Sequence, residues 1–184
     1  MWVVKLGGSL HDSPALRDRL AELATLPGPG RIVVPGGGPF ADLVRRLQPN
    51  LEYDDLAAHR MAILAMQQFG LALHALEPRL SLAESEPELR AARAAIWLPW
   101  RLAGLAPEIA ASWDVTSDSL ACWLATRLGA SRLVLVKSAS ELAGNPADWA
   151  KAGLVDPTFP RYAVRFAGTI ALHHRDEPLG LSGS

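Results

Sequence analysis

A unit of strand, glycine turn and helix occurs twice within the first 50 residues, and it constrains the fold more than any other feature of the chain. In "VVKLGGSL" a short apolar strand over Val3–Leu6 runs into a pair of glycines. In "RIVVPGGGPFADLVRRL" a strand over Arg31–Val34 runs into three glycines and then a helix from Phe40 to about Leu47. Apolar strands that alternate with helices are typical of a parallel sheet covered on both faces. We therefore expect an α/β protein, a three-layer αβα sandwich around a mostly parallel central sheet.

The same alternation continues along the chain. Further helices are predicted over Pro14–Ala24 with Asp12 or Ser13 as cap, Asp54–Leu76, Glu86–Arg93, and from a cap at Ser117 or Asp118 to Gly129. Further strands are predicted within "LSLAES", "AAIWLPW", "RLVLVKS" and "RFAGTIALHH". Residues 139–153 give a weaker signal, typical of an irregular or helical segment, and "LGLSGS" is typical of a frayed end.

Size and composition exclude several classes of protein. The chain has 184 residues and is 49% hydrophobic, enough for a single domain with a sizeable core. Its net charge of -1 gives no general attraction to nucleic acid or to an acidic membrane, so we expect neither as a partner. The single cysteine, Cys122, excludes an internal disulfide and a cysteine metal cluster. Neither a signal peptide nor an apolar run of the roughly 20 residues that span a bilayer is present, so we expect a soluble, cytoplasmic protein.

Two lysines each end an apolar strand. Lys5 ends the first strand, and Lys137 ends the strand in "RLVLVKS". Ligands of open parallel sheets bind outside the carboxyl ends of the strands, and a doubly wound sheet can bring two distant strand ends together. Two ammonium groups at that edge would bind a polyanion. The alternative is that each lysine extends its charge into solvent.

Glycines follow both early strands. Gly7-Gly8 and the run Gly36 to Gly38 each connect a strand to a helix, where backbone amides can point at phosphate oxygens near the positive end of a helix dipole. Tight turns also need glycine, but two such turns at equivalent positions favour an anion site. No Gly-Lys-Ser/Thr follows, so this is not a Walker loop, and no G-x-G-x-x-G fingerprint is present.

Polar residues gather at one predicted helix start, and a few isolated residues are further candidates. "DVTSDS" supplies Asp114, Thr116, Ser117, Asp118 and Ser119, of which capping needs only one. We expect Asp118 to lie beside the lysine ends, where a carboxylate can also help to hold Mg²⁺. His59 shares an apolar helical stripe with Leu56, Ile63, Met66, Gly70 and Leu73, so it is a core or cleft histidine or a substrate contact. Trp113 can line a pocket, His173-His174 lack further ligands and predict no metal site, and no G-x-S-x-G elbow is present.

The ordered motifs "VVKLGGSL", "VVPGGGPFAD" and "DVTSDSLACWLA", ahead of "LVLVKS", resemble the amino acid kinase superfamily, which includes acetylglutamate, uridylate and isopentenyl phosphate kinases. The pair "SWDVTSDSL" and "VDPTFPRY" is similar to the small kinases of methanofuran biosynthesis, which phosphorylate aminomethylfuran-methyl phosphate to the diphosphate. The resemblance implies a single domain over residues 1–184, with an acceptor-binding half over 1–113 and a shortened nucleotide-binding half over 114–184.

The resemblance also implies roles for individual residues. Lys5 would contact the transferred phosphoryl group and Asp118 would orient Lys5, which makes them the catalytic residues. The expected substrate-binding residues are Gly7, Gly8, Ser9, Gly36, Gly37, Gly38, His59, Asp114 and Thr116. The expected nucleotide-binding residues are Ser117, Lys137 and Ser138. The chain departs from the family where an aspartate-rich "TDVDG" stretch is replaced by "LVKSASEL" and where a late "GGM…K" segment with a second lysine is absent.

The residues and the resemblance together predict an ATP-dependent phosphotransferase that uses Mg²⁺ and acts on an anionic oxygen of a small molecule. The resemblance also implies a homo-oligomer. No general base is evident beside the glycine turns, which favours an acceptor that is already ionised. We prefer a phosphate monoester as the acceptor, and the resemblance places the reaction in the biosynthesis of a one-carbon cofactor. Two alternatives stay open: a kinase of amino-acid carboxylates, and a non-catalytic nucleotide- or phosphate-binding protein or subunit.

Overall fold

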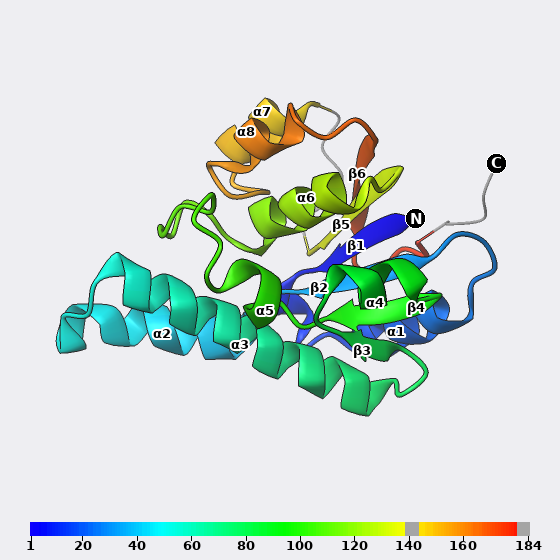
Figure 1. The fold of residues 1–184 in the computed structure, drawn as a ribbon, viewed down its shortest axis with the longest axis horizontal. Coiled ribbons are helices and arrows are strands. Elements are labelled where there is room, and N and C mark those ends of the chain that lie inside the picture. The colour runs from blue at the N-terminus through cyan, green and yellow to red at the C-terminus, as the bar shows by residue number, and fades with distance from the viewer. Residues whose placement is uncertain (139–143, 180–184) are drawn as a thin grey trace.

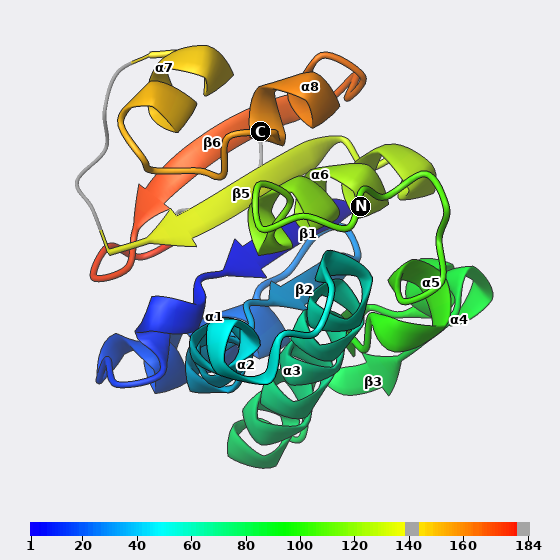
Figure 2. The same ribbon diagram turned by 90° about the vertical axis from the view of Figure 1, so that its left-hand side faces the viewer.

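The computed structural model of the chain describes residues 1–138 and 144–179, and its centre is a six-stranded sheet. The strand order is β3-β4-β2-β1-β5-β6, and all neighbouring strands pair in parallel. Figure 2 shows β6, β5, β1 and β2 in succession across the sheet. The strands are β1 (Trp2–Leu6), β2 (Arg31–Pro35), β3 (Ser81–Ala83), β4 (Ala94–Trp97), β5 (Arg132–Lys137) and β6 (Thr169–His174). The predicted α/β fold is confirmed.

Helices cover both faces of this sheet. Alternate residues of β1 face opposite sides: Val3 packs in a core cluster with α6 and α8, and Val4 packs in a second cluster with α1. The main helices are α1 (Ala15–Thr25), α2 (Gly38–Leu51), α3 (Asp55–Leu76), α4 (Glu86–Ala91), α5 (Trp100–Ala103), α6 (Ser117–Leu128), α7 (Pro146–Lys151) and α8 (Phe159–Ala163), with a short 3-10 turn over Gly8–Leu10. Cys122 is buried in α6, as expected.

The register of the central strands determines where the lysines meet. β1 and β5 are neighbours, and Lys5 pairs with Leu135. Lys137 is two residues further along β5, so it faces the same side of the sheet as Lys5. The sheet thus brings both lysines to one edge, on the side covered by α6.

Helices α2 and α3 form a pair that projects beyond the sheet (Figure 1). α2 runs through Pro49 to Leu51, longer than predicted, and ends where Glu52 adopts a left-handed conformation. Leu56 lies in the first turn of α3, within the projecting part, and is 46% exposed. Leu56 shares the apolar spacing of the stripe but is not buried, and the buried residues of α3 begin at Ala58 and His59.

Several boundaries differ from the prediction. The N-cap of α6 is Thr116, so the predicted caps Ser117 and Asp118 are wrong, and α1 is preceded by Pro14, although the Ser13 hydroxyl accepts a bond from the Ala15 amide. α8 was not predicted. The stretch "LGLSGS" begins at a buried leucine, Leu179, and its remaining residues, like residues 139–143, lie outside the described part of the chain. In the described part, no helix is long and apolar enough to cross a membrane.

Candidate active site

A buried carboxylate joins the two strand-end lysines. Asp118 lies in the first turn of α6, directly above the ends of β1 and β5. Its Oδ1 lies 2.9 Å from the Lys5 Nζ, and its Oδ2 accepts a hydrogen bond of 2.6 Å from the Lys137 Nζ. Lys5 and Asp118 are each 4% exposed. The expected convergence of Lys5, Lys137 and Asp118 is therefore found, and both carboxylate oxygens are occupied.

This arrangement fixes the charges of the site. Burial alone would raise the pKa of Asp118, but the adjacent Lys5 and Lys137 ammonium groups outweigh it and lower the pKa, so the carboxylate stays ionised. Burial, reinforced by the neighbouring Lys5, lowers the pKa of Lys137 to about 8, although Asp118 opposes the shift. One negative charge thus sits between two positive ones, which leaves a net positive site for a polyanion.

The two glycine turns lie against each other. A Cβ on Gly8 would stand 2.4 Å from the amide nitrogen of Gly38, and a Cβ on Gly36 would stand 2.4 Å from that of Gly8. Gly38 also has a positive φ of 52°. Only glycine permits backbones to approach this closely. The Lys5 Nζ lies 3.6 Å from where a Gly7 Cβ would be, so the paired turns lie beside the lysine site.

The start of α6 is held by a distant loop. The Oδ2 atom of Asp156 accepts three hydrogen bonds, from the Thr116 amide (3.1 Å), the Thr116 hydroxyl (2.9 Å) and the Ser119 amide (2.9 Å). Its Oδ1 accepts from the Ser119 hydroxyl at 2.5 Å. Asp156 thus acts as the N-cap that the helix's own residues do not supply, and a carboxylate there also interacts favourably with the helix dipole. It fixes the turn that carries Asp118.

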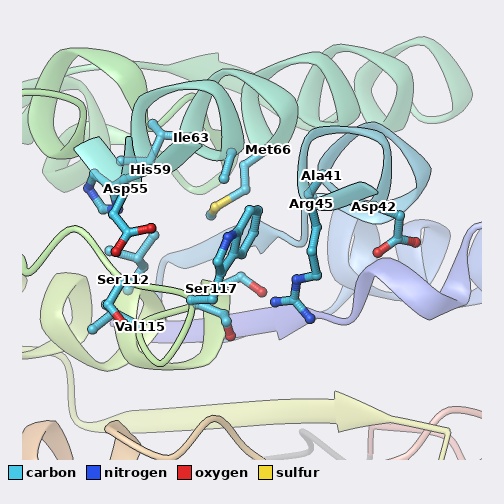
Figure 3. A pocket seen from close by; sticks show the side chains of 15 residues that line it. Ala41, Asp42, Arg45, Asp55, His59, Ile63, Met66, Ser112, Val115 and Ser117 are labelled. Atoms are coloured by element: carbon cyan, nitrogen blue, oxygen red, sulfur yellow. The ribbon is translucent and has the colours of Figure 1, made fainter. Parts of the chain in front are cut away.

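A pocket of about 120 Å³ opens next to the glycine turns, between α2, α3 and the start of α6 (Figure 3). Its floor is apolar and is formed by Ile63, Met66, Val115 and Leu120. Its polar and aromatic lining includes Gly37, Arg45, Asp55, His59, Trp113 and Thr116. Burial, together with the nearby Arg60, lowers the pKa of His59, so its imidazole is neutral at pH 7.

Trp113 forms a rigid wall of this pocket. The guanidinium of Arg45 lies 4.4 Å from the centre of its ring, a cation–π contact. The Trp113 indole donates to Gln48 Oε1 at 2.6 Å, and Gln48 Nε2 donates to Asp55 Oδ1 at 2.9 Å. The loop before α6 is therefore tied to both α2 and α3.

The structure brings together some of the expected site residues and separates others. The pocket is lined by Gly37, His59, Thr116 and Ser117. The Thr116 hydroxyl, however, donates a hydrogen bond to Asp156. Ser117 was expected in the nucleotide site and not in this pocket. Ser9, Asp114 and Ser138 are exposed and do not line it.

The sequence interpretation missed Arg45, Asp55, Gln48 and Asp156. The first three look like ordinary solvated positions on a helix surface, and no local pattern marks them. Asp156 had a signal, because "VDPTFPRY" was paired with "SWDVTSDSL" by resemblance, and these segments are in contact. In residues 1–138 and 144–179, no group of three or more His, Cys, Asp or Glu is arranged to hold a metal ion.

Residues 1–148 match the model of the amino acid kinase family. The chain belongs to this family. A relative within it, the [5-(aminomethyl)furan-3-yl]methyl phosphate kinase of Methanocaldococcus jannaschii, is 30% identical over 140 residues. The match covers 73% of this chain and 64% of that relative.

Solved structures of the amino acid kinase fold superpose on most of the chain. Uridylate kinase from Archaeoglobus fulgidus gives a TM-score of 0.68 at 15% identity, over 93% of this chain and 89% of that one. UMP kinase from Bacillus anthracis gives a TM-score of 0.67 at 15% identity, over 96% and 88%. At this level of identity, these likenesses show the shared fold.

Proposed function

We propose that the protein is an ATP-dependent phosphotransferase that transfers the γ-phosphoryl group to a phosphate monoester. The observation that carries the proposal is the Lys5–Asp118–Lys137 cluster, which lies beside two paired glycine turns and close to a pocket. Membership of the amino acid kinase family and the similarity to an aminomethylfuran-methyl phosphate kinase support it. On this proposal the acceptor is aminomethylfuran-methyl phosphate or a close analogue, in methanofuran-type cofactor biosynthesis.

The chemistry requires one bond to form and one to break. An oxygen of the acceptor phosphate attacks the γ-phosphorus of ATP, the bond from this phosphorus to the β–γ bridging oxygen breaks, and the products are a diphosphate and ADP. Lys5 neutralises charge on the transferred group, while amides of the glycine turns hold its oxygens and those of the acceptor. Catalysis then rests on positioning and charge.

Among the described residues, no free base lies at the lysine cluster, which fits a phosphate acceptor. Asp118 is ionised, but both of its oxygens are held by lysines, so it is not free to accept a proton. A phosphate monoester is already an anion at neutral pH and needs no deprotonation. A carboxylate acceptor would satisfy the same argument and differs only in what fills the pocket.

Nucleotide and metal requirements follow from the same cluster. We propose that residues 1–113 bind the acceptor and residues 114–184 bind ATP, with Lys137 and Ser138 nearest its phosphates. Mg²⁺ would enter with the nucleotide, because both oxygens of Asp118 are occupied and the phosphate oxygens are preferred ligands of this ion. ATP as donor also makes the cytoplasm the proposed place of action.

We also propose that the chain forms a homo-oligomer through α2. Phe40, Leu43, Leu47 and Leu51 form a stripe at helical spacing and are 36–66% exposed, and no residue of α2 is buried. A stripe of this kind can pair with its own copy across a two-fold axis. Leu47→Glu should therefore lower the mass measured by sedimentation, while Leu105→Glu, at a position 70% exposed outside α2, should not. A monomeric wild type would refute this proposal.

Coupled ADP release with Mg-ATP tests the main proposal against a panel of acceptors: aminomethylfuran-methyl phosphate, UMP, isopentenyl phosphate, acetylglutamate and aspartate. We expect turnover on the furan phosphate. Turnover on another acceptor would support the kinase activity but would reject the furan phosphate as its substrate. If ATP raises the melting temperature but no acceptor releases ADP, the chain is a nucleotide-binding protein without kinase activity on this panel.

A further inference from the structure

The two ends of the pocket differ in chemistry. Arg45 lies at one end of the pocket (Figure 3). Gly37, from one of the paired glycine turns, also lines the pocket, and amides at the start of α2 favour an anion. At the other end, Asp55 and His59 lie one helical turn apart on α3. The pocket is thus suited to a ligand that carries opposite charges at its two ends.

Asp55 is oriented by its surroundings. Gln48 Nε2 donates to its Oδ1 at 2.9 Å, which leaves Oδ2 available to a ligand. The neighbouring His59 has a lowered pKa, because it is buried and lies near Arg60, so a neutral imidazole and not a second cation faces the carboxylate's end of the pocket. A cation at this end would meet one negative charge and one neutral ring.

A flat wall and an apolar floor connect the two ends. Arg45 contacts the face of the Trp113 ring, and the indole nitrogen of Trp113 donates to Gln48. The side-chain amide of Gln48 in turn donates to Asp55. Ile63, Met66 and Leu120 lie beneath. An aromatic ring fits such a wall better than a sugar or an extended aliphatic chain, because stacked rings gain contact area and favourable quadrupole interactions.

We propose that the pocket selects phosphate monoesters whose aromatic core carries an ammonium group, with Asp55 binding the ammonium and Trp113 contacting the ring. This inference rests on the proposed phosphotransferase function and assigns the residues that recognise the ring and the amine of its acceptor. The substrate named for the Methanocaldococcus jannaschii relative has these three parts, a phosphate, a furan ring and an aminomethyl group. Asp42 also lines the pocket, but it lies with Arg45 at the end assigned to phosphate.

The test compares two acceptors that differ only at the amine. One is aminomethylfuran-methyl phosphate, and the other carries a hydroxymethyl group in place of the aminomethyl group. The wild type should prefer the amine in kcat/KM by about 10- to 100-fold, the range expected for a charge-assisted bond in a partly closed site. Asp55→Asn keeps the acceptor oxygen for Gln48 and should reduce the preference at least 10-fold, mainly by raising KM for the amine.

Two matched variants show whether the position or the charge is responsible. Asp54→Asn removes the same charge one residue earlier, outside the pocket, and asparagine still caps α3 through the Ala57 amide. Asp42→Asn removes a carboxylate at the opposite end of the pocket. Both should keep the preference for the amine. An unchanged preference in Asp55→Asn, a wild type without preference, or a loss in Asp42→Asn instead would overturn the inference.

Failure of the proposed function is separable from failure of this inference. If neither acceptor releases ADP, calorimetry of the two compounds with wild type and Asp55→Asn gives the same comparison as a ratio of dissociation constants. A preference for the amine that Asp55→Asn removes would then support the amine site in a protein that is not this kinase. Equal affinities for both compounds would reject the amine site.

Discussion

The ammonium of Lys5 and the carboxylate of Asp118 lie 2.9 Å apart, with both side chains 5% exposed. One group comes from the end of β1 and the other from the first turn of α6. A buried lysine held by a carboxylate keeps its position, because it has lost the rotational freedom of a surface lysine. This preorganisation is what a group that meets a transferred phosphoryl needs.

Replacing Lys5 should remove catalysis and keep the fold. Lys5→Met fills the buried space and leaves Asp118 paired with Lys137. We expect kcat to fall by about 10²- to 10³-fold or more, because one preorganised charge at the transition state is lost. Steady-state ADP release with the accepted substrate measures it, and circular dichroism shows whether the fold is kept. Unchanged turnover in a folded variant would remove Lys5 from the mechanism.

Asp118→Asn should destabilise the protein. Two buried ammonium groups would face each other without their shared counter-charge, and breaking a buried ion pair in this way typically costs about 3–5 kcal/mol. Urea unfolding measures the loss. In Asp118→Asn with Lys137→Met, the repulsion between the two cations is also gone, so part of the stability should return, although Lys5 stays buried without its counter-charge. A double variant no more stable than Asp118→Asn would contradict the electrostatic explanation.

Lys137 should give activity and stability opposite dependences on pH. Its pKa is lowered to about 8, so it loses its proton as the pH rises through that value, and kcat/KM should fall. Between about pH 8 and the ordinary lysine value of 10.5, the unfolded chain holds a proton that the folded protein does not, so this group makes the free energy of unfolding rise with pH.

The pH profile of Lys137→Arg is the control for this prediction. Arginine keeps its charge throughout, so the alkaline decline of kcat/KM should move to higher pH. Bound ATP phosphates raise the lysine pKa, and the decline in kcat should therefore begin at a higher pH than that in kcat/KM. An identical alkaline decline in wild type and Lys137→Arg would assign it to another group.

The fold could be predicted from the sequence because its determinants are local. The apolar runs were bounded by glycine, proline or polar residues, and the strand-end position of Lys5 and Lys137 predicted their meeting in a parallel sheet. Leu56 shows the limit of this reasoning. Its spacing fits the apolar stripe of α3, but burial depends on what lies opposite, and the first turn of α3 projects beyond the sheet.

The pocket lining could not be predicted, because it depends on contacts between distant segments. Arg45 and Asp55 lie on helices whose charged residues are indistinguishable in sequence from solvated ones. The cap of α6 is a similar case. "DVTSDS" offers several capping residues of its own, yet the bonds go to Asp156, which follows a turn after α7.

Gly8→Ala should disrupt the site through its neighbour. The new Cβ would stand 2.4 Å from the Gly38 nitrogen and 2.7 Å from the Gly38 Cα, both of which are backbone, so the two turns must move apart. We expect a loss of about 1–3 kcal/mol from overpacking and a larger effect on kcat, since misplaced amides no longer fit the transferred group. Asp12→Ala, at an exposed position in the same connection, should keep wild-type stability within about 0.5 kcal/mol. Wild-type stability and turnover in Gly8→Ala would show that the turns separate freely.

Asp156→Ala tests whether the loop before α8 holds the catalytic carboxylate in place. The change leaves the Thr116 and Ser119 amides and hydroxyls without the acceptor they share, and Ser119 is fully buried. Each orphaned buried donor costs about 1–3 kcal/mol, so the unfolding free energy should fall by about 3 kcal/mol or more. Because the same turn carries Asp118, kcat should fall even at a temperature where the variant is fully folded. Asp114→Ala, which removes an exposed carboxylate from the loop before α6 that Asp156 holds, is the control for stability. If Asp156→Ala lost stability but kept wild-type kcat, the cap would be structural only, and the position of Asp118 would depend on the two lysines alone.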